Sequence, residues 1–224
     1  MRSDSFQAII KHICISNSAT EVLVKIYQLP QRNVHVILNG VDETKFVHDP
    51  EAGVRFPEKL GVLANVSLVM GVAGRTGPWG RRYAELGQNV KVLGALEAHQ
   101  LSEFYNALDV FVNPTLRPQG LDLTLIEAMH RGRTVLTPNY PSIVRTVVVN
   151  EELGYTFSPN VKSFVEALEL VIRDGPKVLQ RKGLACKEHA LSMFTATKMA
   201  SAYERFFLCM KNPIYCQYPF PVDC

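Results

Sequence analysis

The chain has 224 residues, of which 47% are hydrophobic and 20% charged, and its formal net charge at pH 7 is +3. This composition excludes a disordered or collagen-like chain, and no basic run is long enough to indicate a nucleic-acid-binding tail. The longest apolar run, residues 60–74, is interrupted by Asn65 and Ser67, so it predicts a buried strand and not a membrane span. We therefore expect a soluble chain with a packed core.

Short apolar runs alternate with amphipathic stretches along the chain. Strands are predicted at residues 12–16, 34–38, 67–73, 90–93, 110–112 and 134–137, with a further apolar segment at 146–149. Helices are predicted at residues 20–27, 102–108, 123–131, 161–171, 177–193 and 195–210. Residues 43–60 are interpreted as a linker, because Pro50, Gly53 and Pro57 interrupt any pattern. The alternation predicts an α/β fold with a Rossmann-like parallel sheet and helices on both faces.

In such a sheet, ligands bind at the carboxyl ends of the strands, and the segment after the strand at 110–112 is the densest in candidate residues. Gly120 allows a ligand to approach the backbone, and a helix beginning near Asp122 offers free N–H groups to a phosphate. Glu127, in the early turns of that helix, is suited to accept hydrogen bonds from two ribose hydroxyls. The alternative is structural, since Thr124 with Glu127 fits a capping box and Glu127 with Arg131 fits an i,i+4 ion pair.

Arg75, at the end of the strand predicted at 67–73, is suited to bind a diphosphate, or alternatively to form a surface ion pair. The sequence lacks the glycine fingerprint of nicotinamide-dependent dehydrogenases, and it has no GxSxG motif and no metal-ligand spacing. Five cysteines are too few for a disulfide scaffold. Cys216 and Cys224 are expected to pair if the chain enters the secretory pathway.

Several segments occur in an order typical of one family. They are residues 15–18, 34–42, 71–75, 92–94, 104–114 and 120–129. From about residue 10 onward, the chain resembles the carboxyl-terminal part of a family 4 glycosyltransferase of the GT-B fold, which carries a glycosyl transferases group 1 domain. The loop at 117–122 and the ending at 215–224 resemble those of a plant-type subgroup.

The resemblance implies a domain that binds a nucleotide-sugar and transfers the sugar, with retention at the anomeric carbon, to an acceptor that the sequence does not identify. No cofactor or metal is expected. The resemblance implies that Arg75 binds the diphosphate, that Glu127 binds the ribose and that Gly94 lies near the nucleotide base. It further implies that the backbone of four consecutive residues contacts the sugar and phosphates: Gly120, Leu121, Asp122 and Leu123. Gln119 is implied to be an uncharged sugar contact at a position where the family has glutamate.

The same resemblance predicts the domain organisation. Residues 1–45 correspond to a remnant of an acceptor-side domain, 46–65 to a linker, 66–210 to the nucleotide-sugar-binding domain and 211–224 to a Cys/Pro-rich tail. A strand–helix unit of roughly 30 residues, with a phosphate-binding lysine, is expected to be missing between Arg75 and Thr76.

The chain is therefore expected to be truncated and internally shortened, and alone to be inactive. The alternative function is that of a fragment that binds a nucleotide weakly or binds another protein. The intact family is expected to be anchored in Golgi or other secretory membranes, whereas this chain contains no membrane span and no nucleic-acid-binding segment.

Overall fold

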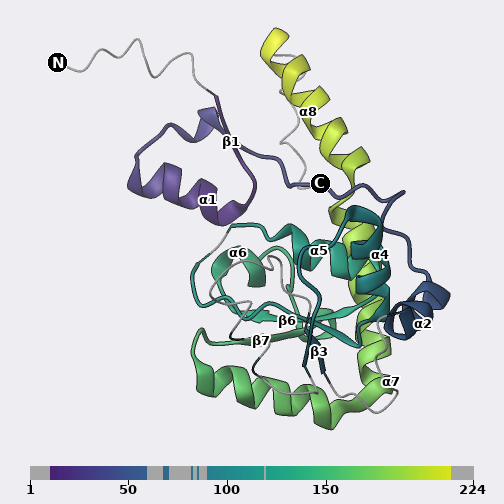
Figure 1. Cartoon of the computed structure of the whole chain (residues 1–224). Helices are drawn as coiled ribbons and strands as arrows, with labels where there is room; N and C mark the ends of the chain where they lie inside the picture. Colours follow the sequence, from purple (N-terminus) through teal and green to yellow (C-terminus); the bar gives the residue numbers. More distant parts are fainter. Residues whose placement is uncertain are drawn as a thin grey trace.

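The computed structural model describes residues 11–59, 68–70, 82, 85, 90–118 and 120–212 (Figure 1). Within these ranges every strand pair is parallel: β1 (His12–Cys14) with β2 (Val34–Val36), β3 (Leu68–Met70) with β4 (Val90–Val92), and β6 (Thr134–Pro138) with both β5 (Val110–Val112) and β7 (Tyr155–Phe157). Helices surround these strands. The predicted α/β fold with a parallel sheet is thus confirmed.

The N-terminal unit, residues 11–38, forms a small layer of its own. Ser16 caps α1 (Asn17–Glu21) by accepting a hydrogen bond from the N–H of Ala19, and the chain continues as a π-helix (Val22–Ile26) before β2. The C-terminal helix α8 (Ala196–Lys211) returns to this unit, where Phe206 and Ala202 pack against Ile37. The first and last parts of the chain therefore lie together (Figure 1).

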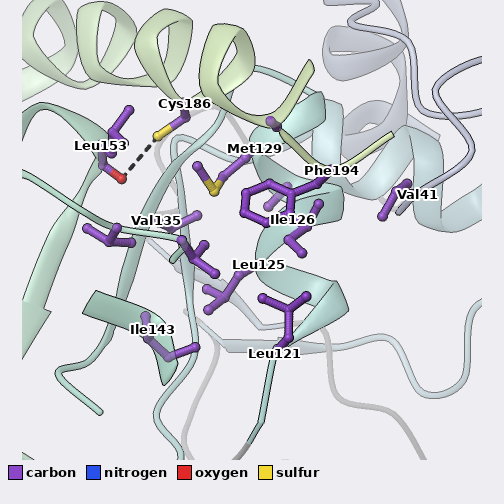
Figure 2. Packing of buried hydrophobic residues seen from close by; sticks show 14 of the residues in the cluster. Val41, Leu121, Leu125, Ile126, Met129, Val135, Ile143, Leu153, Cys186 and Phe194 are labelled. Carbon is purple, nitrogen blue, oxygen red and sulfur yellow. Dashed lines mark hydrogen bonds between the residues drawn. The ribbon is translucent and has the colours of Figure 1, made fainter. Parts of the chain in front are cut away.

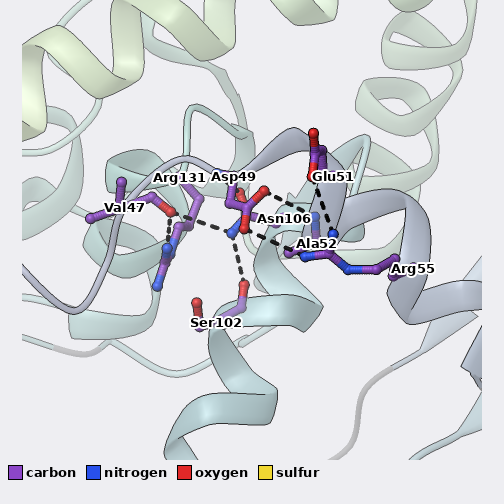
Figure 3. A network of polar contacts seen from close by, with 8 residues as sticks. All are labelled: Val47, Asp49, Glu51, Ala52, Arg55, Ser102, Asn106 and Arg131. Carbon is purple, nitrogen blue, oxygen red and sulfur yellow. Dashed lines mark hydrogen bonds and ion pairs between the residues drawn. The ribbon is translucent and has the colours of Figure 1, made fainter.

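The segment interpreted as a linker contains a helix, α2 (Pro50–Lys59), which corrects the sequence-based expectation. α2 packs on α4 (Ala98–Ala107), and a Cβ at Gly53 would lie 2.1 Å from the carbonyl oxygen of Asn106. Asn106 accepts a hydrogen bond from the N–H of Asp49 and donates to the carbonyl oxygens of Ser102 and Val47 (Figure 3). Gly53 is thus required for close helix packing, not for a break in structure.

The body of the molecule, residues 98–194, is built around β5, β6 and β7. On one side lie α5 (Leu123–His130) and the C-terminal half of the long helix α7 (Val161–Met193), with the short helix α6 (Pro141–Val144) beside them. Figure 2 shows the core between them, in which Met129, Val135 and Phe194 are fully buried. The Cys186 thiol donates to the carbonyl oxygen of Leu153, and burial raises the pKa of this thiol to about 12.

Most of the predicted helices and strands are present within the described ranges, with ends shifted by up to four residues, and some further elements were not predicted. The helices predicted at 161–171 and 177–193 are both present, as the two parts of α7 on either side of a kink at Gly175, whose backbone is not helical (φ +71°). The apolar segment at 146–149 is a turn after α6 that buries Val147 and Val148, whereas β7, which the sequence did not predict, supplies the third strand of the body.

Several sequence-based expectations lie outside the described residues. They concern Arg75, Gln119, the gap expected after Arg75, and the pairing of Cys216 with Cys224. Cys209, near the end of α8, is disulfide-bonded, while Cys14 and Cys186 are free thiols. Of the helices within the described ranges, none combines the length and apolar character needed to cross a membrane. The same ranges contain no group of three or more His, Cys, Asp or Glu side chains placed to hold a metal ion.

Candidate functional site

The loop between β5 and α5 has the geometry of a helix entry fixed by side chains. Asp122 is the N-cap of α5, and its Oδ1 accepts hydrogen bonds from the Thr124 N–H (2.9 Å) and the Thr124 hydroxyl (2.7 Å). Its second oxygen accepts a hydrogen bond from the side-chain amide of Asn113, which directly follows β5. Because Asp122 occupies the cap position, the alternative capping box of Thr124 with Glu127 is wrong.

The first turn of α5 retains free backbone donors. Within the part of the chain that the structure describes, the N–H groups of Leu121 and Leu123 donate no hydrogen bond. Leu121 is buried and anchors the loop in the core, whereas Leu123 is 40% exposed. Unused N–H groups at the positive end of a helix dipole favour an anion, so this turn is suited to bind a phosphate.

Gly120 lies where the body approaches the N-terminal unit. A Cβ at this position would lie 3.5 Å from Cδ1 of Ile15, at ordinary van der Waals distance. Helices α1 and α6 also contact each other across this boundary, and Arg145 pairs with Glu21 at 3.0 Å. Figure 1 shows α5 and α6 on the side of the body that faces the N-terminal unit. The Gly120 end of the candidate site thus lies beside the N-terminal unit.

Glu127 lies one turn further along α5, with its side chain half-buried between α4 and α5. The Tyr105 hydroxyl, from α4, donates a hydrogen bond of 2.8 Å to Oε2 of this carboxylate. Burial raises the pKa of Glu127 above its usual value, Asp122 raises it further, and Tyr105 and Arg131 oppose the increase. A partly desolvated carboxylate with a fixed orientation is a strong acceptor for ligand hydroxyls.

Arg131 is a structural residue and does not form the ion pair with Glu127 that its spacing predicted. Its buried guanidinium donates hydrogen bonds to the carbonyl oxygens of Lys45 (2.5 Å) and Val47, and its centre lies 5.0 Å from the centroid of the Phe46 ring. Desolvation lowers the pKa of Arg131 to about 10. Figure 3 shows how this side chain joins the end of α5 to the segment before α2.

Gly94 lies two residues after the end of β4. It is buried and has a φ of +76°, a conformation that favours glycine. Its neighbours Leu93 and Leu96 pack against the core cluster that includes Leu121 and Leu125. The segment around Gly94 thus packs on the core that also holds the loop before α5, while Arg75 and Gln119 lie outside the described residues.

Two polar residues of this region were missed as functional candidates. The Tyr105 hydroxyl contacts Glu127 and the Asn113 amide contacts Asp122, although neither residue is among the candidates predicted from the sequence. A tyrosine with phenylalanine on an apolar helix face is a weak signal by itself. A buried tyrosine hydroxyl nevertheless requires a hydrogen-bond partner. This requirement is the signal that could have identified Tyr105 as a contact of another polar residue.

Comparison with known proteins identifies a family for this region. The family model described as glycosyl transferases group 1 matches residues 56–174, more than half of the chain. No curated protein sequence matches the chain significantly.

Solved structures match over most of the chain. A glycosyltransferase from Rickettsia africae superimposes with a TM-score of 0.77 at 17% identity, covering 94% of this chain and 68% of the other. A sucrose-phosphate synthase from Thermosynechococcus elongatus gives 0.74 at 18% identity, covering 95% and 65%. The HepE protein of Anabaena, solved in complex with UDP-glucose, gives 0.72 at 16% identity, covering 88% and 63%. The chain thus has the fold seen in GT-B glycosyltransferases and spans about two thirds of the length of these structures.

Proposed function

Because this chain belongs to the glycosyl transferases group 1 family, we propose that it binds the nucleotide part of a nucleotide-sugar donor with Gly94, the loop 120–122 and α5. The proposed donor is a UDP-sugar. A UDP-glucose complex is known for a protein of the same fold, the HepE protein of Anabaena, and this supports the choice of nucleotide.

The observation that carries the proposal is the position of Glu127 relative to the N-terminus of α5. Both features belong to one eight-residue helix, and the helix begins directly after the loop at the carboxyl end of β5. A diphosphate at the free N–H groups and a ribose at the carboxylate are adjacent parts of one nucleotide. Binding of both parts by one helix requires little reorganisation of the protein.

The finer assignments follow from the resemblance to family 4 and its plant-type subgroup. They are transfer with retention of configuration, diphosphate binding by Arg75 and an uncharged sugar contact by Gln119. In this proposal Arg75 and the N-terminus of α5 stabilise the leaving diphosphate, and no metal is required.

A second candidate function is nucleotide binding without sugar transfer. The chain spans about two thirds of the solved structures it matches, and the acceptor part of the site is expected outside the body. The two candidates differ in turnover, because both require donor binding but only the first yields a glycosylated product or slow donor hydrolysis.

Isothermal titration calorimetry of the full chain with UDP and UDP-glucose tests the proposal, with Glu127→Gln as the diagnostic variant. Loss of a charged hydrogen bond costs about 1.5–3 kcal/mol, so we expect Glu127→Gln to weaken binding roughly ten- to hundred-fold. Glu166→Gln, on the exposed face of α7, serves as the matched control and is expected to bind like the wild type.

Absence of UDP and UDP-glucose binding by the folded wild type would contradict the proposal. Equal affinities of the wild type and Glu127→Gln, together with a lower melting temperature of the variant, would instead assign Glu127 a structural role. Turnover of UDP-glucose that depends on Arg75 would exclude the second candidate function.

A further inference from the structure

We propose that Tyr105 is a positioning residue for Glu127, whose phenol holds one carboxylate oxygen so that the other is presented to the hydroxyls of the ligand. The inference rests on the proposed function, because it concerns the same carboxylate. It adds a residue that makes no contact with the donor itself, and it predicts how that residue sets the pH range of binding.

The ring of Tyr105 has little freedom to move. Its side chain is 3% exposed, and its ring centroid lies 5.7 Å from that of Phe104, 5.5 Å from that of Phe111 and 6.4 Å from that of Phe46. These neighbours come from α4, β5 and the segment before α2, so the ring is enclosed by three separate elements. The direction of the hydroxyl is therefore fixed by core packing.

The hydrogen bond takes up only one side of the carboxylate. Oε2 of Glu127 accepts the Tyr105 hydroxyl at 2.8 Å, and no other hydrogen bond to this carboxylate is found within the described ranges. Because the side chain of Glu127 is only half-buried, Oε1 remains available to a ligand. A carboxylate held at one oxygen loses less rotational freedom on binding than a free one, which favours affinity.

The charges around Glu127 determine how the hydrogen bond acts. Tyr105 faces it from α4, and Asp122 and Arg131 act on it from α5. Burial and the two nearby carboxylates raise the pKa of Tyr105 well above its usual value, so the phenol remains protonated and acts as a permanent donor. The hydrogen bond from Tyr105 stabilises the ionised form of Glu127 and opposes the effect of burial.

Removal of the Tyr105 hydroxyl is therefore expected to change the pKa of Glu127 in one direction. Without the Tyr105 hydrogen bond, the pKa of Glu127 rises further, and the carboxylate becomes protonated at a higher pH. A protonated carboxyl accepts hydrogen bonds less well, so ligand affinity falls as the pH decreases through this pKa. If the hydrogen bond only joined α4 to α5 and Glu127 did not contact the ligand, its loss would lower stability without moving the pH midpoint of ligand affinity.

The experiment measures the affinity of the full chain for UDP-glucose between pH 5 and pH 8 by calorimetry. UDP-glucose is suitable because its diphosphate is esterified at both ends and does not titrate in this range. Glu127→Gln, which has no carboxyl group at this position, provides the pH dependence of all other groups. After this background is subtracted, the pH at which half of the affinity change has occurred is the midpoint. We expect the midpoint for Tyr105→Phe to lie about one pH unit above that of the wild type.

The molecule offers a matched control in Tyr155, which is also buried and donates a 2.6 Å hydrogen bond to a carboxylate, that of Asp174, far from the loop before α5. Tyr155→Phe is expected to lower stability and to leave the midpoint unchanged. If Tyr105→Phe does not fold, 3-fluorotyrosine at position 105 keeps the shape of the ring and makes its hydroxyl a stronger donor, which should move the midpoint to lower pH.

Each outcome decides between specific alternatives. If the wild type binds UDP-glucose, Glu127→Gln weakens binding and neither change at Tyr105 moves the midpoint, the inference is overturned while the proposed function stands. An equal shift in Tyr155→Phe also overturns the inference, because the effect is then not specific to Glu127. If the folded wild type binds no UDP-glucose, the proposed function fails and the inference fails with it.

Discussion

The body and the N-terminal unit are both layered α/β structures, but they are stabilised to different extents. In the body, residues such as Leu125, Ile126 and Phe194 are fully buried within one large cluster. The buried cluster of the N-terminal unit consists of Ile37, Ala202 and Phe206, two of which come from α8. Its own helical segment leaves Ile26 and Tyr27 about 70% exposed. The comparison indicates that the N-terminal unit has little core of its own and depends on α8 and on the large cluster, which contains its Leu38 and against which its Ile15 and Val36 pack.

The connection between the two parts is short and partly polar. Val41 forms an isolated parallel bridge with Thr195, and a Cβ at Gly40 would lie 2.1 Å from the Thr195 carbonyl oxygen. Glu43 accepts hydrogen bonds from the Ala196 N–H (3.0 Å) and the Thr197 hydroxyl at the start of α8. The residues that follow β2 therefore hold the helix on which the N-terminal unit depends.

The largest expected effect is that of Phe194→Ala, in the core of the body. Phe194 is fully buried, and its ring lies 5.6 Å from that of His189. Replacement of a buried phenylalanine by alanine typically costs about 3–5 kcal/mol of unfolding free energy, and we expect a loss in this range. Urea denaturation measures it, with Ile172→Ala, which is 72% exposed in the wild type, as the control. A loss below about 1 kcal/mol would contradict the central place of Phe194 in the large core.

A smaller and local effect is expected for Phe206→Ala, in the cluster of the N-terminal unit. Phe206 is 3% exposed and makes an edge-to-face contact with His35. We expect a loss of about 2–3 kcal/mol, because a site in a small cluster collapses more readily than one in a large core.

Hydrogen exchange distinguishes this local effect from global unfolding. The amides of residues 12–36 should exchange faster in Phe206→Ala, while those of β6 keep their protection. Phe207→Ala, 59% exposed on the same helix, is the matched control. Equal loss of protection in β6 would show that the two parts unfold together.

The smallest effect is expected at the connection, for Glu43→Ala. Hydrogen bonds from Thr197 and from the N–H groups at the start of α8 lower the pKa of Glu43 below its ordinary 4.5. The charged carboxylate thus stabilises the folded state above about pH 4.5, and this contribution is lost as the pH falls through the lowered pKa.

At pH 7 we expect a loss of about 1 kcal/mol, as for other helix-capping residues, measured by thermal or urea unfolding. The difference from the wild type should decrease below pH 4.5. Glu204→Gln, on an exposed position of α8, provides the control. A difference that is independent of pH would assign the effect to packing and not to the charge.

The sequence predicted the elements of the body well and the candidate site in part. The strand at 110–112 and the helix beginning at residue 123 were predicted with the observed boundaries, because apolar periodicity and a capping aspartate are local signals. Glu127 stays a predicted ligand contact, whereas its alternative role in a capping box with Thr124 is wrong because Asp122 caps the helix. The helix α2 was missed because Gly53, read as a break, in fact allows contact with Asn106, and that contact exists only in the folded chain.

By itself the sequence determined the α/β class, most of the strands and helices, though not α2 or β7, and the position of the loop before α5, since periodicity, capping residues and motif order are properties of neighbouring residues. The tertiary structure alone placed Tyr105 against Glu127, Arg131 against the carbonyl groups of Lys45 and Val47, and Glu43 at the start of α8. These contacts join residues 22 to 153 positions apart. Their formation depends on which helix faces pack together, and no short stretch of sequence encodes that choice.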